Sequence, residues 1–592
     1  MKKFIIIAAV LIAIAAGIYF FKGGKDGGLS LDINIGDNEV LAYVPADTIF
    51  FTGSLEPISF EKAMAMSQKM GMDPSAFMMM DSDSLEINAD APDALRFLLG
   101  FYGKYMQGFA DNNLTKSMGV NNDLNAAAYM VGAIPVMRVE LDGTETFANL
   151  VASIESEHNV TPVVKSMDSV EYREYSFNAK DKEVPYQLVV SIKDNQAVIT
   201  INTPIADDKD LKAALGVEKP AKSIADTDVL SKMVSANGYQ PHSLFFFDNL
   251  ATVKGITNPA ANSFGAMVQE LLVAHGSADS LAEYQTPACQ TEFAAMAANW
   301  PTINAGYTDF SEGKANFKMV IEGTNTELLN TLAKLRGHLS DNLNNDQFMM
   351  SFGMGFNMDE LVPVITDVWK RLTKEPYECP ALANMQAGLK QQNPMMLGMM
   401  TGMLSGIKGI GFGIVDMDMS NLANAENNPN PMAFTENMEM VLTVSAEEPT
   451  NLLQTLGMYA PEMAQLQLTD GGEAQSLNSP MGGESEIALR GHDLVLMMGS
   501  KANSALSNMS SNKNLDSNGL ISFNMDFGKY MGMIEQMMSG INTSAEMSDE
   551  QKKIIEQQKE VFAKLKQVKG DIKQSFDINQ SGFVSNTAFE AK

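Results

Sequence analysis

The chain has 592 residues, of which 45% are hydrophobic and 19% are charged. This composition excludes wholesale disorder, and the length predicts about four domain-sized units. The 72 acidic residues outnumber the 42 basic ones and give a formal net charge of -30, so we expect no nucleic-acid partner and no attraction to anionic lipid.

The N-terminal residues predict a membrane anchor. Lys2 and Lys3 precede an apolar run at residues 4–21, which is near the lower limit for a membrane-spanning helix. The run stays apolar through Gly17–Phe21, which favours an uncleaved single-pass helix in a bacterial inner membrane, with the bulk of the chain in the periplasm. The alternative is a signal peptide cleaved after Ala13-Ile14-Ala15, which would release the chain into the periplasm.

The first strand that we predict after the anchor runs from Leu41 to Phe51 and contains Val44-Pro45-Ala46-Asp47-Thr48. This opening resembles that of several uncharacterised bacterial cell-envelope families. In those families a membrane anchor or signal precedes a Pro-Ala-Asp-Thr strand and repeated α+β modules. The resemblance implies an exported, non-catalytic protein and transfers no active-site residue.

Three stretches repeat a strand followed by a helix start. Each alternates apolar and polar residues and then reaches a helix-starting signal at Thr144, Thr324 or Pro449. The stretches are Val136–Leu150, Phe317–Leu329 and Met438–Leu453.

A short strand opens each predicted module, at Leu41–Phe51, Leu244–Asn249, Phe348–Asp359 and Leu520–Asp526. The last two copies share Phe-Asn-Met-Asp, and an apolar-periodic run follows each aspartate. We therefore expect Asp359 and Asp526 to be helix N-caps rather than ligands.

A β-hairpin with a two-residue turn is predicted twice, at Leu188–Ile201 and at Glu486–Leu496. A helix is expected after each copy, near Asp210–Leu215 and Ala502–Met509.

These repeats predict a tandem duplication in which residues 39–345 resemble residues 346–592. The expected fold is α+β, with tandem modules of antiparallel sheet and packed helices after an N-terminal transmembrane or signal helix. The expected boundaries are 1–28 for anchor and spacer, 29–240 and 346–515 for two long units, and 241–345 and 516–592 for two short units.

The two cysteines, Cys289 and Cys379, are a candidate disulfide because each precedes a predicted hairpin in adjacent units. Two buried free thiols are the alternative. A bridge would close a loop of about 90 residues, worth roughly 4–5 kcal/mol in the chain-entropy model.

Motifs for chemistry are missing from the sequence. The five histidines are dispersed, and no nucleophile elbow, P-loop, zinc pattern or complete calcium loop occurs. We therefore expect a non-enzymatic protein without catalytic, cofactor-binding or metal-binding residues. A periplasmic hydrolase with dispersed active-site residues stays open as an alternative.

Methionine is unusually frequent, with 44 residues. The densest cluster places Met396, Met399, Met400 and Met403 on one helical face, with Met395 beside them. Such residues fill irregular cores, and they also form deformable apolar surfaces, so these four are candidates for hydrophobic binding. Thioether copper(I) binding by a Met-based metal-handling protein is the third interpretation.

Together these features predict a cell-envelope binding or scaffold protein. It would be tethered to the inner membrane through residues 4–21, and its periplasmic repeats would bind a lipid, a hydrophobic polypeptide or another envelope protein.

Overall fold

The computed structural model describes residues 38–62, 90–178 except 112, 186–203, 208–392 except 312 and 345, 402–417, 438–478 except 459, 484–540 and 568–592, with some isolated positions between them. Within these ranges no helix combines the length and the apolar character needed to cross a membrane. The predicted anchor at residues 4–21 lies outside the described residues.

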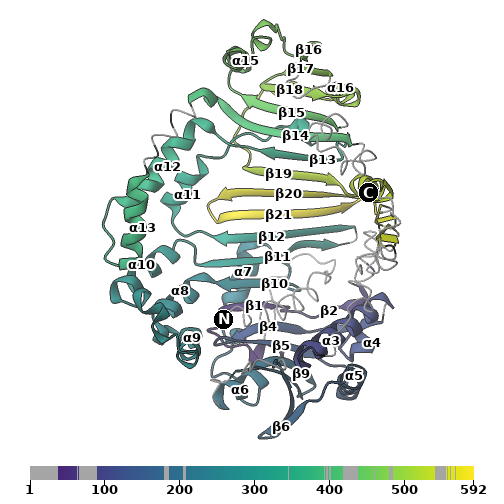
Figure 1. Cartoon of the computed structure of the whole chain (residues 1–592), viewed down its shortest axis with the longest axis vertical. Helices are drawn as coiled ribbons and strands as arrows, with labels where there is room; N and C mark the ends of the chain where they lie inside the picture. The colour runs from purple at the N-terminus through teal and green to yellow at the C-terminus, as the bar shows by residue number, and fades with distance from the viewer. Residues whose placement is uncertain are drawn as a thin grey trace. The chain divides into compact units, whose positions relative to one another are not determined.

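The chain forms two compact units. Unit 1 contains the chain up to Glu322 together with Tyr377–Leu382, and unit 2 contains most of the remainder from Gly323 to Lys592. Each unit is a mixed α+β structure built on a large antiparallel sheet (Figure 1). The finer division into long and short units stays a prediction.

In unit 1 the strands pair in the order β12-β11-β10-β1-β4-β5-β9-β8-β7-β6. The strands are β1 (Phe50–Gly53), β4 (Ala126–Val131), β5 (Ile134–Glu140), β6 (Val163–Met167), β7 (Val170–Ser176), β8 (Gln187–Lys193), β9 (Gln196–Asn202), β10 (Leu244–Asp248), β11 (Thr302–Ser311) and β12 (Lys314–Glu322). A separate small pair is formed by β2 (Ile58–Ser59) and β3 (Asp123–Leu124).

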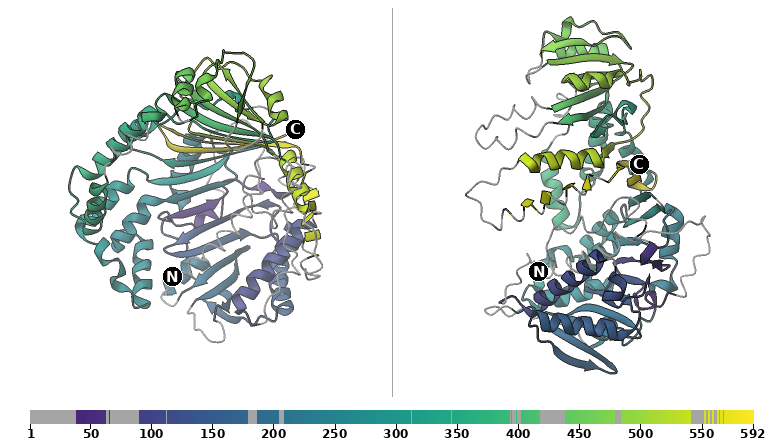
Figure 2. Two further views of the ribbon diagram at one scale, coloured as in Figure 1. Left: turned by 45° about the horizontal axis from the view of Figure 1, so that its top comes forward. Right: turned by 90° about the vertical axis from the view of Figure 1, so that its right-hand side faces the viewer.

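Helices flank this sheet (Figure 2). They are α3 (Asp93–Ala110), α4 (Leu114–Met118), α5 (Thr144–Glu157), α6 (Asp208–Leu215), α7 (Val229–Asn237), α8 (Asn249–Thr257), α9 (Ser263–Ala274) and α10 (Pro287–Ala297). Two separate apolar clusters form the main core, because successive residues of the central strands face opposite sides of the sheet.

In unit 2 the strands pair in the order β21-β20-β19-β13-β14-β15-β18-β17-β16. The strands are β13 (Met350–Met354), β14 (Ile407–Met417), β15 (Met438–Ala446), β16 (Gln475–Asn478), β17 (Glu484–Arg490), β18 (Asp493–Met498), β19 (Ile521–Asp526), β20 (Gly570–Asn579) and β21 (Gly582–Ala591). The α-helices are α11 (Thr326–Ala333), α12 (Met358–Thr373), α13 (Pro380–Gln391, whose first residues are assigned to unit 1), α15 (Pro449–Gly457), α16 (Ser500–Leu506) and α17 (Phe527–Gly540).

The two units share one strand order. Unit 1 without β6 has the same chain order and the same pairing partners as unit 2, from β1 and β13 at the start to β12 and β21 at the end. Two-residue turns at Asp194-Asn195 and Gly491-His492 fix the register of the corresponding hairpins β8–β9 and β17–β18. When the two turns are aligned, Gln196 of unit 1 takes the same position as Asp493 of unit 2. Following the pairing register to the neighbouring strands makes Ala128 of unit 1 equivalent to Phe412 of unit 2.

Three expected helix caps differ in the structure. Thr144 is the first residue of α5, after Gly143, and Asn325 rather than Thr324 caps α11 by accepting a hydrogen bond from the Leu328 amide. Asp359 lies inside α12, because its carboxylate instead accepts hydrogen bonds from Ser405, Gly406 and Lys408. Pro449 begins α15, and Asp526 accepts a hydrogen bond from the Lys529 amide at the start of α17, as predicted.

A disulfide joins Cys289 of α10 to Cys379 within unit 1, with Cα atoms 4.5 Å apart. Both side chains are completely buried and share a small apolar cluster with Leu382. The Glu292 carboxylate accepts hydrogen bonds from the amides of Glu378 and Cys379, which holds this segment against α10.

Candidate functional site

An apolar cavity of about 40 Å³ lies in unit 1, between one face of the sheet and helices α3, α4 and α5. Eleven residues from the sheet, the helices and the loops beside them form its wall. The lining residues are Phe101, Tyr105, Leu114, Met118, Val120, Leu124, Met137, Val139, Phe147, Ala197 and Ile199.

Helix α3 supplies the aromatic side of the cavity. Phe97, Phe101 and Tyr105 follow one another at intervals of four residues, so they share one face of the helix. Phe97 stacks on Tyr175 of β7 at 4.3 Å between ring centroids, and Phe101 meets Phe147 of α5 edge-on at 6.4 Å. These ring contacts fix α3 over the sheet.

The close packing of α3 on α4 depends on Gly108. A Cβ atom there would lie 2.3 Å from the Ser117 hydroxyl oxygen, which is far inside van der Waals contact. Because α4 contributes Leu114 and Met118 to the cavity, this approach helps to set the cavity's size.

The sheet supplies a flat apolar wall. Met137 pairs directly with Ile199, and Val139 pairs directly with Ala197, so the four side chains share one face of β5 and β9. All four are buried, with at most 6% of each residue exposed. Ala197 is the smallest of them and leaves the most room.

Polar groups are almost missing from the cavity wall. Among the lining side chains, only Tyr105 carries a strongly polar group, and no hydrogen-bond partner for its hydroxyl is found in the described residues. Burial raises the pKa of Tyr105 well above its usual range, and Tyr102 adds to the shift. The phenol is therefore uncharged at neutral pH and can donate one hydrogen bond.

Most of the methionines chosen from the sequence lie outside the described residues, namely Met395, Met396, Met399 and Met400. Met403 lies in a short 3-10 turn at Gly402–Leu404, and its side chain is not described. Their role in binding stays a prediction.

The histidines are dispersed in space among the contacts that the structure describes. His275 meets the Tyr186 hydroxyl at 2.6 Å, whereas His242, His338 and His492 contact the backbone oxygens of Glu56, Asp516 and Ala446. The described residues also contain no group of three or more His, Cys, Asp or Glu side chains that could hold a metal ion.

Sequence reasoning missed the cavity, because its wall comes from residues spread between positions 101 and 199. The aromatic spacing of Phe97, Phe101 and Tyr105 was the available signal. By comparison with known proteins, no family matches this chain, and no curated protein or solved structure is detectably similar to it.

Proposed function

We propose that the chain is a non-enzymatic binding or scaffold protein of the bacterial cell envelope, and that unit 1 binds an apolar group in the cavity beneath α3. The observation that carries this proposal is the cavity wall, which combines aliphatic and aromatic side chains with a single hydroxyl. Ligand pockets of binding proteins have this composition, with few polar groups to orient the ligand.

An acyl chain fits these features better than a flat polar molecule. The sheet wall and the Phe101–Phe147 pair form two apolar sides, and the cavity of about 40 Å³ between them takes up the terminal methylenes of such a chain and removes them from water. The uncharged Tyr105 hydroxyl can donate a hydrogen bond to an ester or carboxyl oxygen at the end of such a chain.

Photo-crosslinking tests the location of binding. Membranes that contain the full chain are treated with a medium-chain fatty acid carrying a diazirine near its methyl end, and labelled peptides are identified by mass spectrometry. We expect labels on α3, α4 and β5. Labels spread over the surface, with none on these elements, would contradict the proposal.

The envelope location is proposed from residues 4–21, with support from the disulfide, since such bonds persist in oxidising compartments. A reporter fused after Lys592 should be active only in the periplasm, and the mature chain should still begin at Met1 or Lys2. A soluble form that begins at Ala16 would replace the anchor with a signal peptide.

We also propose that the two units arose by duplication, which their shared strand order supports. The hydrolase and the Met-based metal-handling protein stay hypotheses.

A further inference from the structure

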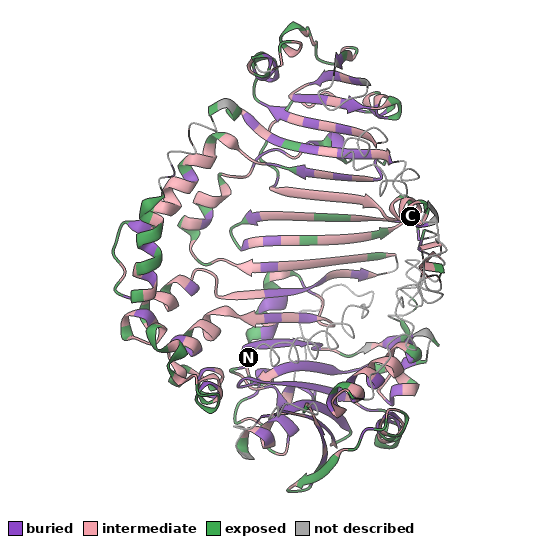
Figure 3. Cartoon of the chain, in the orientation of Figure 1, coloured by how far each residue is buried: buried purple, intermediate pink, exposed green. Residues whose placement is uncertain are grey.

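The cavity wall of unit 1 has a counterpart in unit 2 that is partly open. The register makes Ala126, Ala128, Met137 and Val139 equivalent to Ile410, Phe412, Leu442 and Val444. In unit 1 all four residues are buried in the cluster that contains Phe97 and Phe101 of α3. In unit 2 Ile410 is 40% exposed, and the other three are half-buried. In Figure 3, β4 is mostly buried, whereas β19, which pairs with β13 in unit 2, is half-buried along its length.

The exposed positions are neighbours and form a continuous surface. Met354, which is 38% exposed, pairs directly with Ile410. Together they lie in a row of directly opposed apolar residues on five consecutive strands. The row is Val444, Ile410, Met354, Ile521 and Phe576. A parallel row of Leu442, Phe412, Phe352 and Phe523 lies beside it, and we call the two rows the unit 2 apolar face.

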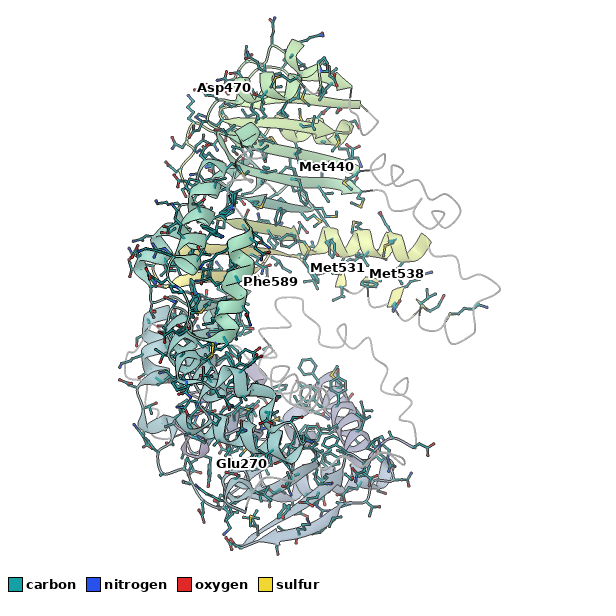
Figure 4. The ribbon with its side chains drawn as sticks, turned by 60° about the vertical axis from the view of Figure 1, so that its left-hand side comes forward. Glu270, Met440, Asp470, Met531, Met538 and Phe589 are labelled. Atoms are coloured by element: carbon teal, nitrogen blue, oxygen red, sulfur yellow. A yellow bond between two sulfur atoms is a disulfide. The ribbon has the colours of Figure 1, made fainter. Side chains whose placement is uncertain are left out.

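The boundaries of the unit 2 apolar face are set by other elements of unit 2. On the reverse side of β14, Leu343 and Phe348 fill the space that Gly411 and Gly413 leave. On the apolar side, Tyr530, Met533 and Met537 of α17 pack near Ile414, while Met358 packs near Ile407. Figure 4 labels Met531 and Met538 on the same helix α17, and Met440 on β15. The middle of the rows, at Met354 and Ile410, stays open.

Charge distinguishes the occupants that could cover this face. At one end of β14 the Lys408 ammonium contacts two carboxylates, Asp359 at 2.6 Å and Glu447 at 2.9 Å. This end of the unit 2 apolar face thus has two carboxylates for one ammonium. An anionic membrane surface is repelled by this arrangement, whereas a polypeptide with flanking Lys or Arg is attracted.

We propose that the unit 2 apolar face binds an amphipathic helix of a partner polypeptide, with basic residues beside its apolar stripe. Five strands at the usual spacing measure about 19 Å from first to last, the length of a helix of about 13 residues. Helix α3 covers the equivalent face of the sheet in unit 1. The unit 2 apolar face can therefore pack against a helix in the same way. The flexible thioether side chain of Met354 adapts to the partner's shape.

This inference rests on the proposed binding role and names a class of partner for it. The residues that carry it all lie in unit 2. The test uses the full chain in zwitterionic nanodiscs and a fluorescent helical peptide of about 14 Leu and Lys residues. A peptide with the same apolar stripe and Glu in place of Lys is the charge control. Binding is followed by fluorescence anisotropy.

We expect saturable binding of the Leu–Lys peptide that weakens about tenfold or more in the double variant Ile410→Ser/Met354→Ser. The control variant Val273→Ser, at an exposed apolar residue of α9, should bind normally. Ala197→Leu, which fills the unit 1 cavity, should also bind the peptide normally, so failure of the cavity proposal and failure of this one are separable. Circular dichroism and thermal unfolding check that each variant folds.

Three results would overturn the inference. The first is no saturable peptide binding, or equal binding by the Ile410→Ser/Met354→Ser variant. The second is equal binding of the Leu–Glu peptide, which would remove the basic partner. The third is cosedimentation with phosphatidylglycerol vesicles that is lost in the double variant, which would assign the face to a membrane.

Discussion

Arg138 donates a hydrogen bond of 3.0 Å to the side-chain oxygen of Gln196, and both side chains are almost completely buried. The guanidinium also lies 4.0 Å from the centroid of the Tyr43 ring. Within the described part of the chain, the guanidinium also donates hydrogen bonds to the Tyr129 hydroxyl and the Ala214 carbonyl, which are both uncharged. Neutral acceptors and an aromatic ring therefore stabilise this buried cation.

The first prediction concerns this arrangement. Gln196→Leu removes the acceptor at 3.0 Å and leaves a buried guanidinium short of one partner, so we expect a loss of about 2–4 kcal/mol in the free energy of unfolding. Urea unfolding followed by circular dichroism measures it. Gln187→Leu, at a half-buried position on β8, is the control and should lose far less. Equal losses in the two variants would contradict a special role for Gln196.

Unit 2 has Asp493 at the position of Gln196. Its carboxylate is fully buried and accepts hydrogen bonds from Ser340 at 2.5 Å, Asn342 at 3.1 Å and Ser445 at 2.5 Å. Asp493→Ala should cost about 3–5 kcal/mol of unfolding free energy, because three buried donors lose their acceptor. Asp493→Asn keeps the shape and should cost less. A smaller loss for Asp493→Ala than for Asp493→Asn would contradict this account.

The third prediction is a loss of stability at alkaline pH. Burial, reinforced by the hydrogen bond that its hydroxyl donates to Asp194, raises the pKa of Tyr43 to about 12. The folded state therefore keeps a proton that the unfolded state loses near its ordinary pKa of about 10. This contribution to stability is complete below pH 10 and is lost as the pH rises through 12.

Tyr43→Phe should make stability depend less steeply on pH between about 10 and 12, although it also removes the hydrogen bond to Asp194. Urea unfolding at a series of pH values provides the slopes. Tyr307→Phe should reduce the slope in a similar way, because burial also raises the pKa of Tyr307 to about 12. An unchanged slope in Tyr43→Phe would show that this phenol ionises normally in the folded protein.

The fourth prediction concerns the disulfide. Cys289 and Cys379 are separated by 90 positions, so their bridge restricts a long loop in the unfolded chain. Reduction should lower the unfolding free energy by about 2–5 kcal/mol. The double variant Cys289→Ser/Cys379→Ser should show the lower stability and no response to reductant. A response of that variant to reductant would mean that something other than this bridge is affected.

Local patterns predicted the hairpins well. The alternation of β8 and β9 surrounds Asp194 and Asn195, which adopt the positive φ values that a two-residue turn needs. The same logic located β17 and β18. These elements are determined by residues next to one another in the chain.

Long-range contacts were not predictable from one sequence. Asp359 looked like a helix cap, but Lys408, nearly 50 positions later, contacts its carboxylate. The cavity is a similar case, since Ala197 and Phe101 line one space without any spacing pattern that relates them. The register equivalence of Ala197 with Leu494 of unit 2 also became evident only from strand pairing.

The dissociation constant of decanoate for the full chain, compared with that of Ala197→Leu, tests the cavity proposal most directly. Leucine is the natural residue at the equivalent position 494, so the strand geometry accepts it, and in unit 1 it fills the cavity. Both affinities are measured by isothermal titration calorimetry in identical nanodiscs. The partition of decanoate into lipid is then the same for each variant and does not affect the comparison. The matched control is Ala225→Leu, at a half-buried position beside the other core cluster. The account predicts binding that weakens about tenfold or more in Ala197→Leu and is unchanged in Ala225→Leu. Equal affinity in Ala197→Leu, or no binding by the unmodified chain, would contradict it.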